Sequence, residues 1–119
     1  MLIPLSSHLF DESTPTLIFT DFRHQTKQDI HVAIDFEQDV LPQIMAELYL
    51  RKIQSLIVEG GAFLLQSFIQ SQLWDEIRIE TTDMNLRRGV KAPIYQGKLV
   101  NVQKCENSLI SVYKNEFIP

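Results

Sequence analysis

The residues best suited to chemistry form one short stretch, Glu59-Gly60-Gly61, between an apolar run and a helical pattern. A carboxylate at this point can accept hydrogen bonds from a hydroxyl or an amine of a ligand. Two glycines let the backbone turn tightly and leave its N–H groups open to a ligand. Because the first amides of a helix lack partners and the helix dipole is positive there, this stretch predicts a phosphate or pyrophosphate site. The alternative is a plain strand-to-helix turn, since two glycines are a weaker signal than a full dinucleotide fingerprint.

The flanking residues predict the elements that would position this site. Leu56, Ile57 and Val58 form a continuous apolar run, which is typical of a strand covered on both faces, with Glu59 at its carboxyl end. From Ala62 onward the apolar residues recur with a helical period. One face of that helix carries Leu64, Leu65, Phe68, Ile69 and Leu73.

The remaining titratable side chains offer weaker candidates. His8, His24 and His31 are not spaced as metal ligands, so we interpret them as solvated or structural histidines. Arg87 and Arg88 form an adjacent cationic pair. This pair could meet a 2′-phosphate, but the preferred interpretation is a solvated basic pair.

The whole chain alternates strand-like and helical segments. Strands are expected near residues 16–20, 30–34, 56–58, 77–80, 99–105 and 108–114, and helices over residues 40–50 and from residue 62. Asp39 is a plausible N-cap for the first helix, and Pro42 falls in its first turn. Glu106-Asn107 separates the last two strands, as in a two-residue hairpin. The order predicts an α/β fold with a mainly parallel sheet flanked by helices and an antiparallel C-terminal hairpin.

Trp74 is expected to be a packing anchor or a subunit contact.

Composition limits the class of protein. The 119 residues allow one domain, spanning residues 1–119. A net charge of −4 with scattered cations argues against nucleic-acid binding. The single cysteine, Cys105, excludes an internal disulfide and fits a reducing compartment, and no apolar run is long enough for a membrane span. We therefore expect a soluble cytoplasmic protein.

Four segments in order carry a resemblance to a known family. They are residues 14–20 (Thr-Pro-Thr-Leu-Ile-Phe-Thr), 53–61 (Ile-Gln-Ser-Leu-Ile-Val-Glu-Gly-Gly), 64–69 (Leu-Leu-Gln-Ser-Phe-Ile) and 73–76 (Leu-Trp-Asp-Glu). Together they resemble the reductase domain of the bifunctional riboflavin-biosynthesis deaminase/reductase. The resemblance runs from Met1 nearly to the end and is strongest over residues 53–76.

The resemblance implies a dihydrofolate-reductase-like fold and a specific reaction. The family uses NADPH to reduce the ribose of 5-amino-6-(5-phosphoribosylamino)uracil, a pyrimidine ribose phosphate, to a ribityl chain. Glu59 would contact the substrate sugar, and no residue is an obvious acid or base for the hydride step. The cofactor-binding residues that the resemblance implies are Thr20, Gly60, Gly61, Ala62, Phe63, Leu64, Leu65, Gln66 and Ser67.

The chain also departs from the family pattern. The deaminase domain of the family has a zinc site with several cysteines. This chain has a single cysteine, so no deaminase activity is expected. The family's opening strand and helix have no counterpart before Met1, and residues 2–5 resemble the end of an interrupted strand. Residues 81–93 lack the commoner Pro-x-Leu-Leu-Gly-like segment. We therefore expect the C-terminal part of a reductase domain.

An incomplete sheet would leave an edge or an apolar face that another copy must cover. We therefore expect a homo-oligomer, most simply a two-fold homodimer. Two alternatives stay open: a non-catalytic remnant that is stable only as an oligomer, and an unrelated nucleotide-binding module with the same glycine-led helix.

Overall fold

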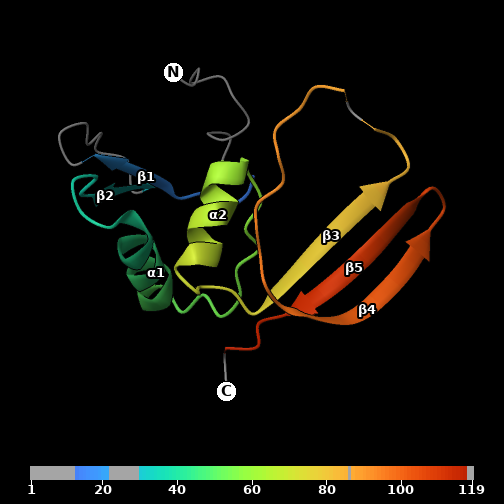
Figure 1. Ribbon diagram of the computed structural model, residues 1–119. Helices are drawn as coiled ribbons and strands as arrows, with labels where there is room; N and C mark the ends of the chain where they lie inside the picture. The colour runs from blue at the N-terminus through green and yellow to red at the C-terminus, as the bar shows by residue number, and fades with distance from the viewer. Residues whose placement is uncertain (1–12, 22–29, 86, 118–119) are drawn as a thin grey trace. The chain divides into compact units, whose positions relative to one another are not determined.

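A computed structural model describes residues 13–21, 30–85 and 87–117 (Figure 1). The chain divides into two compact units, Met1–Leu56 and Ile57–Pro119, and each is described by itself. The prediction of one domain over residues 1–119 stays a prediction. The expected strand end at residues 2–5 lies outside the described residues, as do His8 and His24.

The first unit contains a short parallel sheet. Strand β1 (Ile18–Asp21) pairs with β2 (His31–Ile34), so that Ile18 lies opposite His31 and Asp21 opposite Ile34. The expected strands at residues 16–20 and 30–34 are confirmed, with bounds shifted by one or two residues. The Ile34 side chain is buried. It belongs to the apolar positions whose alternation over residues 30–34 predicted this strand.

Helix α1 (Val40–Leu50) follows β2, and Asp39 is its N-cap as predicted. Leu41 is the buried residue on its apolar face. The side chain of Gln43 holds the turn before the helix. Its Oε1 accepts from the Asp35 N–H at 2.8 Å, and its Nε2 donates to the Asp35 carbonyl at 2.8 Å. One glutamine therefore satisfies both backbone groups of a residue that lies outside regular structure.

The second unit contains helix α2 (Ala62–Gln70) and an antiparallel sheet of order β3-β5-β4. Its strands are β3 (Glu76–Thr82), β4 (Lys98–Cys105) and β5 (Ser108–Lys114). Cys105 pairs with Ser108 across the two-residue turn, which confirms the hairpin. The register shifts between Leu99 and Asn101, as in a β-bulge.

The two faces of this sheet differ in chemistry. Ile77 lies opposite Tyr113 on β5, which in turn lies opposite Leu99 on β4, so these three side chains share one face. The other face carries Glu76 and Lys114, whose Oε2 and Nζ form an ion pair at 2.8 Å. The alternation of Ile77 and Ile79 with charged residues thus predicted β3 correctly.

The predicted strand at residues 56–58 is wrong. Residues 53–59 form neither helix nor strand, and the Ile57 side chain is 85% exposed. An apolar run forms a buried strand only where neighbouring strands supply hydrogen-bond partners, and no described strand pairs with this one. The expectation of a mainly parallel sheet is therefore also wrong, because the larger sheet is antiparallel. The dihydrofolate-reductase-like topology stays a prediction.

Candidate functional site

The site predicted from the sequence is the N-terminal end of α2, here called the helix mouth and made up of residues 59–64. Helix α2 begins at Ala62 with Gly61 as its N-cap, as predicted. Gly60 has φ +154, a conformation that side chains rarely adopt, and it makes the turn into the helix. The sequence therefore predicted both the start of the helix and the need for a glycine before it.

Unlike Gly60, Gly61 lies at a position where a residue with a side chain could stand. Its φ of −67 and ψ of 156 suit any residue, and a Cβ placed there would meet nothing within 4 Å. Neither backbone conformation nor internal packing therefore requires a glycine at residue 61. The open space beside its backbone is available to a ligand.

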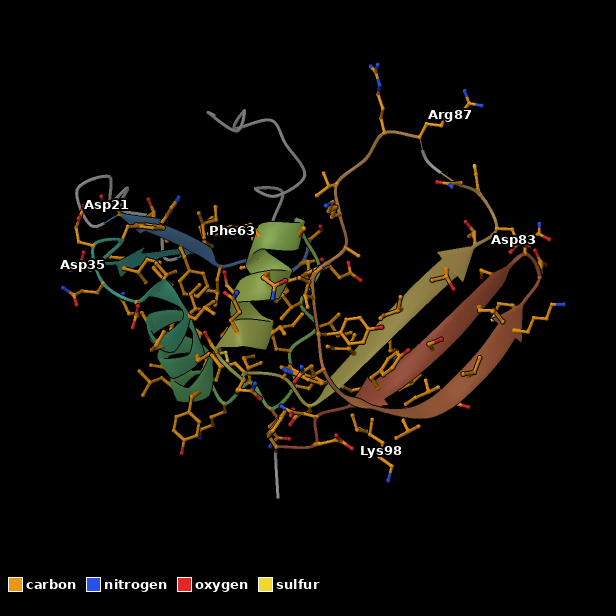
Figure 2. The ribbon with its side chains drawn as sticks, in the orientation of Figure 1. Asp21, Asp35, Phe63, Asp83, Arg87 and Lys98 are labelled. Carbon is orange, nitrogen blue, oxygen red and sulfur yellow. The ribbon has the colours of Figure 1, made fainter. Side chains whose placement is uncertain are left out.

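The first amides of α2 have no acceptor within the helix. The Leu65 N–H donates to the Gly61 carbonyl at 3.3 Å, which leaves the N–H groups of Ala62, Phe63 and Leu64 ahead of the first helical bond. No side chain caps this end of α2. The Phe63 side chain is 88% exposed, and Figure 2 shows it at the N-terminal end of the helix. Three unpaired donors and the positive end of the dipole suit an anion.

Glu59 is an exposed residue two positions before the N-cap. Its expected place at the carboxyl end of a strand is wrong, because residues 56–58 form no strand. It still precedes the two glycines directly, and its role in binding a substrate sugar stays a prediction.

Two predicted cofactor residues use their side chains within the second unit. Gln66 Nε2 donates to the Ile94 carbonyl at 3.1 Å, and the Ile94 N–H donates to Gln66 Oε1 at 2.7 Å. Ser67 Oγ donates to the Phe63 carbonyl at 2.9 Å. Thr20 lies on β1 of the first unit, opposite Ala33. The cofactor-binding roles of Thr20 and of residues 60–67 stay predictions.

Sequence reasoning missed the contact between Gln66 and Ile94. The two residues are 28 positions apart, and neither carries a local signal for the pairing. Another missed contact involves Trp74, which lies against Gly97, where an added Cβ would come within 2.9 Å of the indole. The expectation that Trp74 is a packing anchor is consistent with this contact. Its indole N–H is buried and finds no acceptor among the described residues.

The side chains with shifted pKa values lie on the sheet or beside it. Hydrogen bonds from Lys114 and Arg78 lower the pKa of the Glu76 carboxyl. A hydrogen bond to Tyr113 raises the pKa of Tyr95. Both shifts arise from contacts of the antiparallel sheet, between β3 and β5 for Glu76 and with β5 for Tyr95. No group of metal-ligating side chains occurs among the described residues, and within the same residues no helix is long and apolar enough to cross a bilayer.

Comparison with known protein families identifies the family of this chain. A family model described as the RibD C-terminal domain matches residues 2–84, which is more than half of the chain. The match includes the helix mouth and β3, and it ends before the hairpin of β4 and β5. No curated protein and no solved structure shows significant similarity to the chain. The chain therefore belongs to the RibD C-terminal domain family, the reductase domain of riboflavin-biosynthesis deaminase/reductases.

Proposed function

We propose that this chain binds NADPH at the helix mouth and takes part in reducing the ribose of 5-amino-6-(5-phosphoribosylamino)uracil to a ribityl chain. Membership of a riboflavin-biosynthesis reductase family supports the reaction class, because such reductases act on small molecules and generally use a nicotinamide cofactor. The observation that carries the site is the open space at Gly61, next to three amides that precede the first hydrogen bond of the helix.

The proposed contacts follow from the backbone N–H groups and the carboxylate of the helix mouth. The N–H groups of Ala62, Phe63 and Leu64 would donate to the cofactor pyrophosphate, and Gly60 and Gly61 would let it approach the backbone. Glu59 would accept hydrogen bonds from the sugar hydroxyls of the substrate. Residues 65–67 would add further cofactor contacts within the second unit. NADPH supplies a hydride when bound, and the task of the protein is to orient the two reactants.

Gly61→Val tests this site directly. The branched side chain would fill the open space at the mouth, so we expect NADPH affinity to fall at least tenfold. Valine adopts the backbone conformation of residue 61 without strain, so the cost in stability should be about 1 kcal/mol or less. Fluorescence titration with NADPH would measure the affinity of the wild-type chain and of the two variants. Gly61→Ala, which adds a smaller side chain than Gly61→Val, should have a smaller effect. Equal affinity for wild type and Gly61→Val would exclude the mouth as the pyrophosphate site.

We also propose that the chain forms a homodimer. Exposed apolar side chains support this proposal: Ile57 is 85% exposed, and Leu99 and Val102 are about half exposed on the sheet. Sedimentation at micromolar concentration should give twice the mass of one chain. A monomer at that concentration would contradict the proposal.

The alternative is a family member that binds no cofactor. One observation favours it: residues 56–58, which the sequence predicts to form the strand leading into the site, form no strand. A wild-type chain that is folded but does not bind NADPH at millimolar concentration would support this alternative.

A further inference from the structure

The outer edge of β3 takes no part in the proposed cofactor site. The sheet of the second unit has the order β3-β5-β4, so β3 pairs with β5 on one side only. No other described segment makes a backbone hydrogen bond to residues 76–82. The strand spans seven residues, keeps a regular register with β5 and contains no proline. An edge of this kind is a template for pairing with another strand.

The ladder between β3 and β5 shows which backbone groups of β3 face this edge. The Asn115 N–H donates to the Asp75 carbonyl at 3.1 Å, so these two residues form a hydrogen-bonded pair. Such pairs alternate with non-hydrogen-bonded ones along an antiparallel ladder, so every second residue after Asp75 also bonds to β5. The residues between them direct their N–H and carbonyl groups away from β5. They are Glu76, Arg78, Glu80 and Thr82.

The charges along β3 are complementary to those of a second β3. Ile79 is the middle residue of the strand, so an antiparallel pair with a two-fold axis at Ile79 would match the whole strand. Arg78 of each copy would then lie opposite Glu80 of the other. An axis at Arg78 would instead place two arginines opposite each other, and an axis at Glu80 two glutamates. Charge and overlap therefore favour the same register.

Both charged side chains are exposed and keep capacity for a further partner. The Arg78 side chain is 75% exposed, and its Nε donates to Glu76 Oε1 at 2.6 Å. Its terminal nitrogens are separate donors that can bind a second carboxylate. Glu80 is also exposed, and its Oε1 accepts from Ser108 Oγ at 2.6 Å. A carboxylate can accept several hydrogen bonds, so this contact does not exhaust Glu80.

The opposite edge of the sheet lacks this complementarity. Strand β4 carries Lys98 and Lys104, and its register shifts between Leu99 and Asn101. Edge lysines and bulges are features that protect a strand from pairing with another chain. Strand β3 has neither, so β3 is the edge of this sheet that suits a second copy.

We propose that the homodimer forms by antiparallel pairing of two β3 strands about a two-fold axis at Ile79, which joins two three-stranded sheets into one. The inference rests on the proposed homodimer and assigns its interface. The backbone groups of Arg78 and Glu80 bond across the axis, and their side chains pair opposite charges on one face of the joined sheet.

Charge reversal in the full chain tests this interface, with sedimentation equilibrium as the measurement. Arg78→Glu places glutamates opposite each other, and Glu80→Arg places arginines opposite each other. Each variant should raise the dimer Kd about tenfold. An equimolar mixture of the two variants should dimerise about as well as the wild type, because both cross-strand pairs then have opposite charges. Lys104→Glu, the same charge change on β4, is the matched control for Arg78→Glu and should leave the Kd unchanged.

Amide hydrogen exchange locates the interface without a substitution. The Arg78 and Glu80 amides should exchange rapidly in dilute solution and slowly where the chain is dimeric. The Ile79 amide, which bonds to β5, should be slow at both concentrations. Rapid exchange of Arg78 and Glu80 in the dimer would overturn the proposal. Slow exchange in the monomer would also overturn it, because another segment of the same chain would then cover the edge.

These measurements separate the interface from the homodimer itself. If the wild-type chain is a monomer at micromolar concentration, the homodimer and the interface both fail. If the wild-type chain is a dimer and charge reversal at Arg78 or Glu80 leaves its Kd unchanged, only the interface fails. Neither result depends on NADPH, so the cofactor site is tested independently.

Discussion

At the scale of single residues, the best-defined charge contact is that of Glu76. Arg78 Nε approaches one carboxylate oxygen of Glu76 at 2.6 Å, and Lys114 Nζ approaches the other at 2.8 Å. Lys114 lies directly opposite Glu76 in the pairing of β3 with β5. The contact is exposed, so its main effect is on the ionisation of Glu76 and on the choice of cross-strand partner.

Hydrogen bonds from Lys114 and then Arg78 lower the pKa of Glu76 below its ordinary value of 4.5. Because the folded pKa lies below the unfolded one, this contribution to stability is complete above about pH 4.5 and is lost as the pH falls through the folded pKa. Lys114→Met should raise the pKa of Glu76 and reduce the loss of stability on acidification. NMR titration of the Glu76 carboxyl measures the first effect, and urea unfolding below pH 5 measures the second.

Lys98→Met is the matched control for this prediction. Lys98 lies opposite Lys114 on β4, on the side away from β3. Its removal should leave the Glu76 titration nearly unchanged. Equal shifts in the two variants would mean that general charge, rather than the direct contact with Lys114, sets the pKa.

At the scale of elements, both helices end in the same way. After α1, the Lys52 N–H donates to the Tyr49 carbonyl at 2.9 Å and the Ile53 N–H donates to the Leu48 carbonyl at 3.0 Å. After α2, Gln72 and Leu73 make the equivalent pair of bonds, at 3.1 and 3.0 Å. These are Schellman motifs, in which the residue after the C-cap takes a left-handed conformation.

The left-handed residue is not glycine in either motif: φ is +61 at Lys52 and +56 at Gln72. Glycine avoids the steric cost of this conformation but loses more entropy on folding. We therefore expect Lys52→Gly and Gln72→Gly each to stabilise the fold by about 0.5–1 kcal/mol. Urea unfolding would measure the change. Ser71→Gly, at a C-cap with φ −79, is the control and should destabilise the fold.

The predictions from sequence succeeded where local signals decide the structure. Asp39 before an apolar period located the start of α1, and the glycines at 60 and 61 located the start of α2. Glu106-Asn107 between two alternating runs located the hairpin. The prediction failed for residues 56–58, because an apolar run does not reveal whether a partner strand is available. The bonds between Gln66 and Ile94 could not be predicted, since they join residues far apart in sequence.

At the scale of the whole molecule, burial is confined to a few positions. The apolar side chains buried among the described residues are Ile34, Leu41 and Phe68. Many large apolar side chains are at least half exposed, including Ile57, Phe63 and Val90. Some of these, such as Phe63, lie at the proposed ligand site, and others support the proposed dimer. The stability of a single chain should therefore depend strongly on where an apolar substitution is made.

The same substitution at two isoleucines tests this distribution of burial. Ile34 is 4% exposed on β2, whereas Ile57 is 85% exposed in the segment that the sequence predicts to be a buried strand. Ile34→Val removes a buried methyl group and should cost about 0.5–1.5 kcal/mol. Ile57→Val should change stability by less than about 0.5 kcal/mol, because its side chain is already in water. Urea unfolding of both variants at a concentration where the chain is monomeric would measure the difference. An equal loss of unfolding free energy in the two variants would show that the Ile57 side chain is buried, which would contradict its exposure in this structure.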